Sequence, residues 1–171
     1  ITRSNKRANI YNNGIRNMML DHEKELSSGD MLMIVKNNYF WTEKEKKESG
    51  EESAGAVPAF LANGDRAKVL RVSNYIELYG FRFATLLLQL PDYDDYEMQV
   101  TGMLDTLQSE APALTHEQQE ELFRQVEEDY QHFVPLKADR MKSIRQDAYF
   151  NALQIKYAYA VTCHKAQGGQ W

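Results

Sequence analysis

The chain has 171 residues, of which 43% are hydrophobic and 26% are charged, and its formal net charge is −5 at pH 7. This length and composition allow one moderate hydrophobic core or two small ones, and they exclude a disordered or fibrous protein. The negative net charge argues against a generally basic nucleic-acid binder, although single regions can still carry the opposite charge.

The cysteine count and the apolar runs predict the compartment. Cys163 is the only cysteine, which excludes an intrachain disulfide and favours a reducing environment. The apolar runs are shorter than a membrane span, and the N-terminus lacks the apolar core of a secretory signal. We therefore predict a cytoplasmic protein without a membrane partner. The first residue, Ile1, and the last, Trp171, indicate a piece of a longer chain.

The first predicted elements are one helix and several short strands. Apolar residues at helical spacing predict a helix over residues 5–20, which Ser4 or Asn5 would cap. The pattern then changes to short strands, which are typical of a small barrel or sandwich. These strands are expected at residues 31–36, 59–62, 67–72, 81–90 and 96–104. Residues 42–55 alternate in charge and predict a flexible loop. Asn63-Gly64 predicts a two-residue hairpin turn with positive φ at both positions.

Two helices and a strand are predicted in the last third. Thr115 and Gln118 make a capping box for a helix over residues 115–133, whose outer face is acidic. A second helix is expected over residues 139–153, followed by a strand over residues 157–162. The apolar stripe of the first helix consists of Leu122, Phe123, Val126, Tyr130 and Phe133. Basic side chains gather in residues 137–165, next to the C-terminal motif.

The sequence VTCHKAQGG carries the clearest chemical signal. The predicted strand ends at Thr162, and His164 and Lys165 follow directly, so that a hydroxyl, an imidazole and an ammonium lie within four residues. All three groups can contact phosphate, and the two glycines let the backbone approach a ligand closely. The motif predicts an anion site. The alternative is a strand end with a glycine-rich turn and incidental His and Lys side chains.

The same stretch, AYAVTCHKAQGGQW, resembles motif V of superfamily 1 helicases of the RecD, Dda and Pif type, in which a strand ends in Thr-x-His-Lys-x-Gln-Gly. At the other end, ITRSNKRANIYNNGIR resembles the strand-to-helix segment of the same RecA-like motor domain. GDMLMIVKNNYF and FLANGDRAKVLRV are similar to the Src-homology-3-like barrel inserted in RecD-type enzymes. The matching positions are Thr2, Ser4, Asn5, Ala8, Asn12, Arg16, Thr162, His164, Lys165, Gln167 and Gly168.

The resemblance implies an α/β fold. Residues 1–28 and 136–171 would form part of the second RecA-like domain, with a P-loop NTPase-type parallel sheet. Residues 29–135 would form the inserted small β-barrel with a helical elaboration. The acidic helix at residues 115–133 is an extra element without a counterpart in the family.

The function implied by the resemblance is that of a fragment of an ATP-dependent 5′ to 3′ DNA helicase, similar to the exodeoxyribonuclease V alpha subunit and active in DNA repair or recombination. The cofactors of the full-length protein would be ATP and Mg. The partners would be single-stranded or forked DNA, the missing N-terminal RecA-like domain and subunits of a nuclease complex. The chain has no G-x-x-x-x-G-K-S/T loop, so the fragment is expected to be inactive alone.

The resemblance also assigns roles to residues, and the barrel adds candidates of its own. DNA contacts are expected from Thr162, His164, Lys165, Arg3, Ser4 and Asn5. Coupling to the nucleotide is expected from Gln167, Gly168, Gly169 and Gln170, although many relatives have Glu in place of Gln170. Candidates for base stacking in the barrel are Asn38, Tyr39, Phe40 and Trp41, with a core role as the alternative. The His residues have no metal-ligand spacing, so we expect no metal site.

Two other classes of function compete with the helicase. A cysteine hydrolase that uses Cys163 and His164 is disfavoured, because neighbours on a strand point to opposite faces. A stand-alone barrel that binds proteins or nucleic acid, with the acidic helix as a docking face, stays open.

Overall fold

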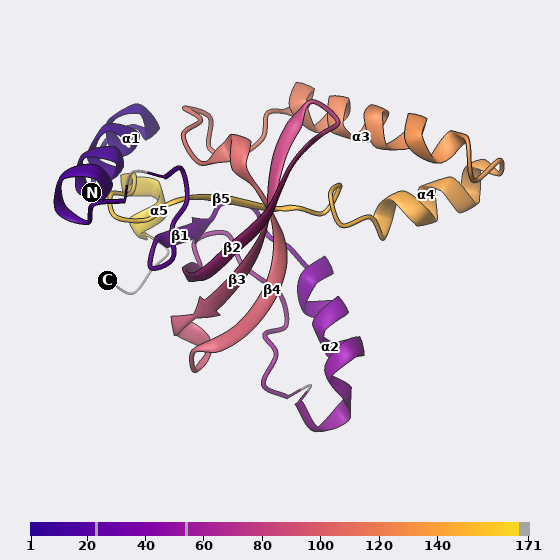
Figure 1. Cartoon of the computed structure of the whole chain (residues 1–171), viewed down its shortest axis with the longest axis horizontal. Coiled ribbons are helices and arrows are strands. Elements are labelled where there is room, and N and C mark those ends of the chain that lie inside the picture. Colours follow the sequence, from indigo (N-terminus) through magenta and orange to yellow (C-terminus); the bar gives the residue numbers. More distant parts are fainter. Residues whose placement is uncertain (23, 54, 168–171) are drawn as a thin grey trace.

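The computed structural model describes residues 1–22, 24–53 and 55–167, with the backbone alone for residues 51–53 (Figure 1). Within these residues the chain is an α/β protein with five helices and a closed barrel of five strands. The strands are β1 (Met31–Ile34), β2 (Arg66–Leu78), β3 (Phe81–Leu90), β4 (Tyr96–Met103) and β5 (Leu153–Tyr157).

The barrel is mixed. Neighbouring strands from β1 to β4 pair antiparallel. β5 closes the barrel by pairing antiparallel with β1 and parallel with β4. Side chains alternate along β3, so that Ala84 and the three leucines at 86, 88 and 90 are all buried on one face. The barrel therefore has its own hydrophobic core.

Four of the helices lie around the barrel in two pairs, and the fifth lies by itself (Figure 1). α1 (Asn5–Gly14) continues as a π-helical turn, Ile15–Met19, and lies near the short α5 (Cys163–Gln167). α3 (His116–Gln131) and α4 (Lys137–Arg145) pack together and meet the far end of the β2–β3 hairpin. A second apolar cluster fills this contact, with Phe83, Leu122, Val126 and Ile144. α2 (Phe40–Ser53) projects from the barrel.

Several predictions from the sequence are confirmed. β3 occupies residues 81–90 as expected, and β4 ends one residue earlier than expected. Both halves of the capping box between Thr115 and Gln118 are present at the start of α3. Ser4 caps α1 by accepting a hydrogen bond from the backbone N–H of Arg7 at 3.3 Å. These elements carry strong local signals, namely a clear period or a cap.

The predicted loop at residues 42–55 is wrong, because α2 runs through most of it. Glu and Lys are good helix formers, and Lys44 and Glu48 lie one turn apart with 3.8 Å between their charged groups. Over residues 40–50, the part of the helix whose side chains the structure describes, burial is confined to the first turn, where Trp41 and Thr42 anchor the helix to the barrel. A helix fixed at one end needs no apolar stripe further along.

The prediction around Asn63-Gly64 is also wrong. Gly64 has a φ of 105°, but Asn63 has no positive φ, so the turn is not the mirror-image hairpin turn. The expected strand at residues 59–62 is reduced to one bridge between Leu61 and Asn38. This segment pairs beyond the end of β1 and not with β2.

The C-terminal helix and strand are displaced from their predicted positions. The helix expected over residues 139–153 ends at Arg145, and the strand expected over residues 157–162 is β5, which ends at Tyr157. All five residues of β5 are buried, and the barrel needs them to close between β1 and β4. The barrel therefore extends beyond the predicted boundary at residue 135.

A buried ion pair joins α1 to the barrel. The fully buried carboxylate of Asp30 accepts hydrogen bonds from Nε of Arg16 at 2.9 Å and from its terminal nitrogen at 2.8 Å. The hydroxyl of Tyr159 donates to the same carboxylate at 2.9 Å, and the backbone N–H of Ser27 donates at 2.7 Å. Burial raises the pKa of Asp30, but these hydrogen bonds outweigh burial and hold the pKa below its usual value.

This network explains why the predicted apolar face of the first helix is wrong. The buried residues of the helix are Ala8, Asn12 and Arg16, spaced one turn apart, whereas Met18 is 89% exposed. Hydrogen bonds and an ion pair decide which face is buried, and the larger apolar side chains Ile10, Tyr11, Met18 and Met19 are exposed.

Asp30→Asn should lower the free energy of unfolding by about 3–5 kcal/mol, because it leaves the buried guanidinium of Arg16 without a counterion. Urea unfolding at neutral pH measures the change. The matched control is Asp92→Asn, since Asp92 accepts the same two kinds of hydrogen bond from Arg66 at an exposed position and should cost less than about 1 kcal/mol. Equal losses in the two variants would contradict the central role of Asp30.

Barrel closure also depends on a glycine. A Cβ at Gly102 would lie 2.5 Å from Cδ1 of the buried Leu86 and 3.4 Å from Cδ1 of Ile155. Gly102 pairs with Leu153, so this is the point at which β4 meets the closing strand.

Gly102→Ala should therefore destabilise the fold by about 1–3 kcal/mol through overpacking. Gly14→Ala is the control, because Gly14 has helical φ and ψ and no atom within 4 Å of its added Cβ. This second variant should gain about 0.5–1 kcal/mol. Denaturant unfolding of both variants tests the pair, and a neutral Gly102→Ala would show that the barrel closes with room to spare.

Candidate nucleic-acid interface

The first and last segments of the described chain meet in a parallel bridge between Thr2 and Thr162. The N–H of Thr2 donates to the carbonyl of Val161 at 2.8 Å, and the N–H of Cys163 donates to the carbonyl of Thr2 at 2.9 Å. A helix begins directly after each segment, α1 after Ser4 and α5 after Thr162. The bridge thus places two strand ends and two helix starts together, which is the edge at which parallel α/β structures bind ligands.

Asn12 holds this arrangement in place. Its side-chain carbonyl accepts from the N–H of Ala160 at 2.6 Å, and its amide nitrogen donates to the carbonyls of Ala160 at 3.0 Å and Tyr157 at 3.3 Å. Beyond Ala158, whose N–H still donates to the carbonyl of Met31, the chain leaves the barrel sheet. Asn12 therefore supplies hydrogen bonds to Ala160 that a neighbouring strand would otherwise make. The resemblance matched Asn12 without giving it a role.

The three motif residues present different groups. His164 is exposed, Lys165 is half-buried, and Thr162 is 9% exposed. Among the described residues, the hydroxyl of Thr162 and the ring of His164 make no hydrogen bond within the chain, so both can bind a ligand. Lys165 donates through Nζ to the side-chain carbonyl of Asn63, and burial lowers its pKa.

The N-terminal candidates for DNA contact, Arg3, Ser4 and Asn5, also differ in whether their side chains already have partners. Arg3 is exposed, and its guanidinium makes no ion pair with the described residues. Ser4 caps α1, and Asn5 donates to the carbonyl of Glu110 at 3.0 Å. The side chains of Ser4 and Asn5 therefore have structural partners.

Lys156 is a functional candidate that the sequence analysis missed. It lies on β5 and is 9% exposed, and it lines a narrow cavity between α1 and the barrel together with Asn12, Thr162 and Lys165. Its ammonium donates to the carbonyl of Ser109. Burial, and secondly the positive charge of Lys165, lower the pKa of Lys156 to about 8. The signal in the sequence was a single charge inside the apolar run LQIKY.

Neither lysine forms an ion pair with a carboxylate among the described residues. Two ammonium groups that repel each other beside the unpaired hydroxyl of Thr162 make a site of positive potential in a chain whose net charge is negative. This arrangement favours an anion.

The prediction that Cys163 lies on an alternating strand is wrong, because Cys163 is in the first turn of α5. Its thiol donates to the carbonyl of Thr2 at 3.3 Å. The argument from opposite strand faces against a Cys163–His164 pair therefore does not hold. The structure still gives no pairing of the two side chains, because the thiol is directed to a backbone carbonyl.

The four stacking candidates have different surroundings. Trp41 is 4% exposed and donates through Nε1 to the carbonyl of Asn151 at 2.9 Å, so its indole belongs to the core. Asn38 caps α2 by accepting from the N–H of Trp41 at 3.2 Å. Phe40 is half-buried with its ring at right angles to Trp41. Tyr39 is 53% exposed and alone among the three rings presents a large open surface.

Of the four predicted nucleotide-coupling residues, the structure describes one. Gln167 is exposed at the end of α5. Gly168, Gly169 and Gln170 lie outside the described residues.

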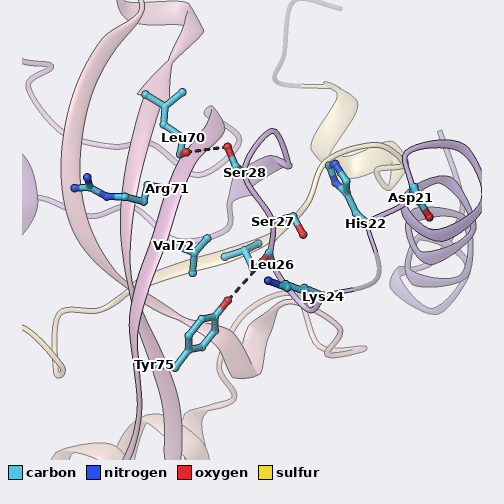
Figure 2. A pocket seen from close by; sticks show the side chains of 10 residues that line it. All are labelled: Asp21, His22, Lys24, Leu26, Ser27, Ser28, Leu70, Arg71, Val72 and Tyr75. Carbon is cyan, nitrogen blue, oxygen red and sulfur yellow. Dashed lines mark hydrogen bonds between the residues drawn. The ribbon is translucent and has the colours of Figure 1, made fainter.

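A larger cavity of about 730 Å³ lies between residues 21–22 and 24–28 on one side and β2 on the other (Figure 2). Ser28 donates to the carbonyl of Leu70 at 2.8 Å across it, and the hydroxyl of Tyr75 approaches the carbonyl of Leu26 at 3.5 Å. The ring of His22 lines this cavity and contacts the buried Asp30 at 3.0 Å. Among the residues that the structure describes, the cavity shares no lining residue with the one at Thr162, and none of the predicted site residues lines it.

Within the described ranges, no group of three or more His, Cys, Asp and Glu side chains is placed to hold a metal ion. The same residues include no helix that is long and apolar enough to cross a membrane. No protein-family model matches the chain, and no curated protein matches it.

The lowered pKa of Lys156 predicts how stability changes with pH. In the unfolded chain the ordinary pKa is 10.5, so between pH 8 and 10 the unfolded chain binds more protons than the folded one. The free energy of unfolding should therefore rise as the pH increases over this window. At 1.36 kcal/mol per pKa unit, the total rise for complete deprotonation is about 3 kcal/mol.

Urea unfolding at pH 8, 9 and 10 measures this slope, and Lys156→Met should flatten it while keeping the side-chain volume. Tyr157 and Tyr159, whose pKa values burial raises to about 12, act in the opposite direction only above pH 10. An unchanged slope in Lys156→Met would mean that Lys156 is solvated.

Proposed function

We propose that this chain is part of an ATP-dependent 5′ to 3′ DNA helicase of the RecD-like group of superfamily 1, in which it contacts the phosphates of single-stranded DNA. In this proposal residues 1–20 and 158–167 belong to the edge of the second RecA-like domain. The closed barrel corresponds to the inserted Src-homology-3-like barrel, and α3 is the additional acidic helix.

The observation that carries the proposal is the parallel bridge between Thr2 and Thr162. Two segments that resemble neighbouring strands of a RecA-like sheet are separated by about the whole length of the chain. They nevertheless lie side by side in parallel orientation, each followed by a helix. A separation of these two ends would have removed the basis of the assignment.

The charges at this edge support a DNA ligand. Arg3, His164, Lys165 and Lys156 gather around the bridge without an acidic partner among the described residues. Backbone N–H groups at the start of α1 add a positive partial charge. Phosphate is the anion that a strand of DNA offers at every nucleotide.

The open face of α1 supports the partner domain of the proposal. Ile10 and Tyr11 of α1 and, in the π-helical turn that continues it, Met18 and Met19 are all more than half exposed. A second RecA-like domain of the same protein would cover these side chains. That domain would also bring the loop that binds ATP and Mg, so the present chain alone is inactive.

The proposal predicts that the chain binds a fluorescein-labelled oligothymidine, with an affinity that falls steeply as salt rises. Thr162→Val removes the hydroxyl and keeps the branched side chain, and His164→Ala removes the ring. Each should weaken binding by about 10-fold or more, because a hydrogen bond to a charged group is worth about 1.5–3 kcal/mol. Fluorescence anisotropy measures the dissociation constants at 50 and 200 mM salt.

Cys163→Ser is the control, since its hydroxyl can still donate to the carbonyl of Thr2. Thermal melting shows that each variant is folded. Loss of binding in Cys163→Ser together with unchanged binding in Thr162→Val and His164→Ala would overturn these roles.

A further inference from the structure

We propose that a pocket between β1, α2 and α3 binds one unstacked base of the single strand, and this inference rests on the proposed function. The pocket lies among the segment after β1, the start of α2, the side of α3 and the turn before β5. Its volume is about 220 Å³. This is below the range of about 300–1,000 Å³ for drug-sized ligands, and it suits a single flat ring system.

Aromatic rings form one wall. Tyr39 lines the pocket and is stacked on Phe60, with 4.9 Å between the ring centroids and an angle of 23° between the planes. Phe60 holds one face of the tyrosine ring, and 53% of Tyr39 stays exposed. Phe40 and Phe150 complete the apolar surface. A ring that is supported from behind and open in front is suited to stacking on a base.

Side-chain amides form the other wall, and some of them are already used within the protein. Asn38 donates to the carbonyl of Asn151 at 3.0 Å and caps α2. The side-chain carbonyl of Gln154 accepts from the N–H of Leu114 at 2.9 Å. These two residues shape the pocket and have no role in the proposal beyond that.

Three amides retain groups without a partner among the described residues. Asn37 uses its carbonyl for the N–H of Asn63 and leaves its amide nitrogen open. Gln119 accepts from Lys36 and Gln154 at 3.4 Å each and also leaves its amide nitrogen open. Asn151 uses its amide nitrogen for backbone carbonyls and leaves its side-chain carbonyl open.

These open groups are two donors and one acceptor, beside an aromatic wall. The edge of a base presents donors and acceptors in the same alternating manner, and amide side chains are among the groups that bind it. The lining also contains the ammonium of Lys36 and, among the described residues, no Asp or Glu. This neutral and basic lining stands out, because α3 is acidic on its outer face.

The pocket is connected to the phosphate site. Nζ of Lys165 donates to the side-chain carbonyl of Asn63, and the N–H of Asn63 donates to the side-chain carbonyl of Asn37 at 2.7 Å. Asn37 is part of the pocket lining. One strand can therefore place a phosphate at Lys165 and direct a base across the turn at Asn63 into the pocket.

The test compares an oligothymidine with an abasic oligonucleotide of the same length, both labelled with fluorescein. Tyr39→Ala should weaken binding of the oligothymidine by about 5- to 150-fold, the range for stacking of one base, and should leave binding of the abasic strand unchanged. Tyr39→Phe should restore the loss. Gln119→Ala, with folding checked by thermal melting, should weaken only the oligothymidine, by about 2- to 10-fold.

Tyr75→Ala is the matched control, because Tyr75 is 56% exposed on β2 and does not line this pocket. Lys165→Ala should weaken both strands alike. Equal effects of Tyr39→Ala on both strands, or no effect on either, would overturn the base pocket while leaving the phosphate site intact.

If neither strand binds the unmodified chain, the phosphate contacts of the proposed function fail. The pocket is then tested by titration with thymidine monophosphate, followed by NMR of the side-chain amide signals of Gln119 and Asn151. Shifts of these signals that disappear in Tyr39→Ala would support the pocket. Their absence at millimolar ligand would overturn it.

Discussion

The buried carboxylate of Asp30 is the constraint on which the arrangement of the termini depends. It joins the π-helical turn after α1, the segment before β1 and Tyr159 beyond β5, all through hydrogen bonds of 3.0 Å or less. A charge without water is costly unless every lone pair is used, so these three segments have little freedom to move apart. Arg16 also lies over the ring of Tyr157, at 4.4 Å from its centroid. The orientation of α1 against β5 follows from this network, and with it the position of Thr2 beside Thr162.

The proposed phosphate site and the barrel share structural parts. Lys156 belongs to the strand that closes the barrel, and Lys165 is hydrogen-bonded to the turn at Asn63. Asn12 fixes the segment between them. A ligand that draws Lys165 away must therefore either break its bond to Asn63 or move the turn that ends at β2. In the proposed motor, this is a physical route by which binding of a strand would be felt in the inserted barrel.

Local signals made part of the fold predictable. β3 follows a period of two, and α3 combines a period of 3.6 with a capping box, so neither needs knowledge of distant residues. The errors lie where distant contacts decide. Hydrogen bonds of Asn12 and Arg16 reverse the expected face of α1, and a charged helix replaces a loop because Trp41 anchors one end. The sequence predicted the strand at residues 157–162 instead of 153–157, because Lys156 interrupts the apolar run of β5. In the fold, the ammonium of Lys156 has a partner in the carbonyl of Ser109.

The site was predictable only where its residues are contiguous. The motif gave Thr162, His164 and Lys165 together, whereas Lys156 and Asn12 come from other segments and join them through the fold. Trp41 is buried and Tyr39 is exposed, a difference that the sequence alone does not show. The pair Lys156 and Lys165 then has a physical meaning beyond the motif. Two ammonium groups held near each other without a carboxylate lower the stability of the free protein. In the proposed function, an anion bound at this place would remove that cost, and the free energy so recovered would add to its affinity.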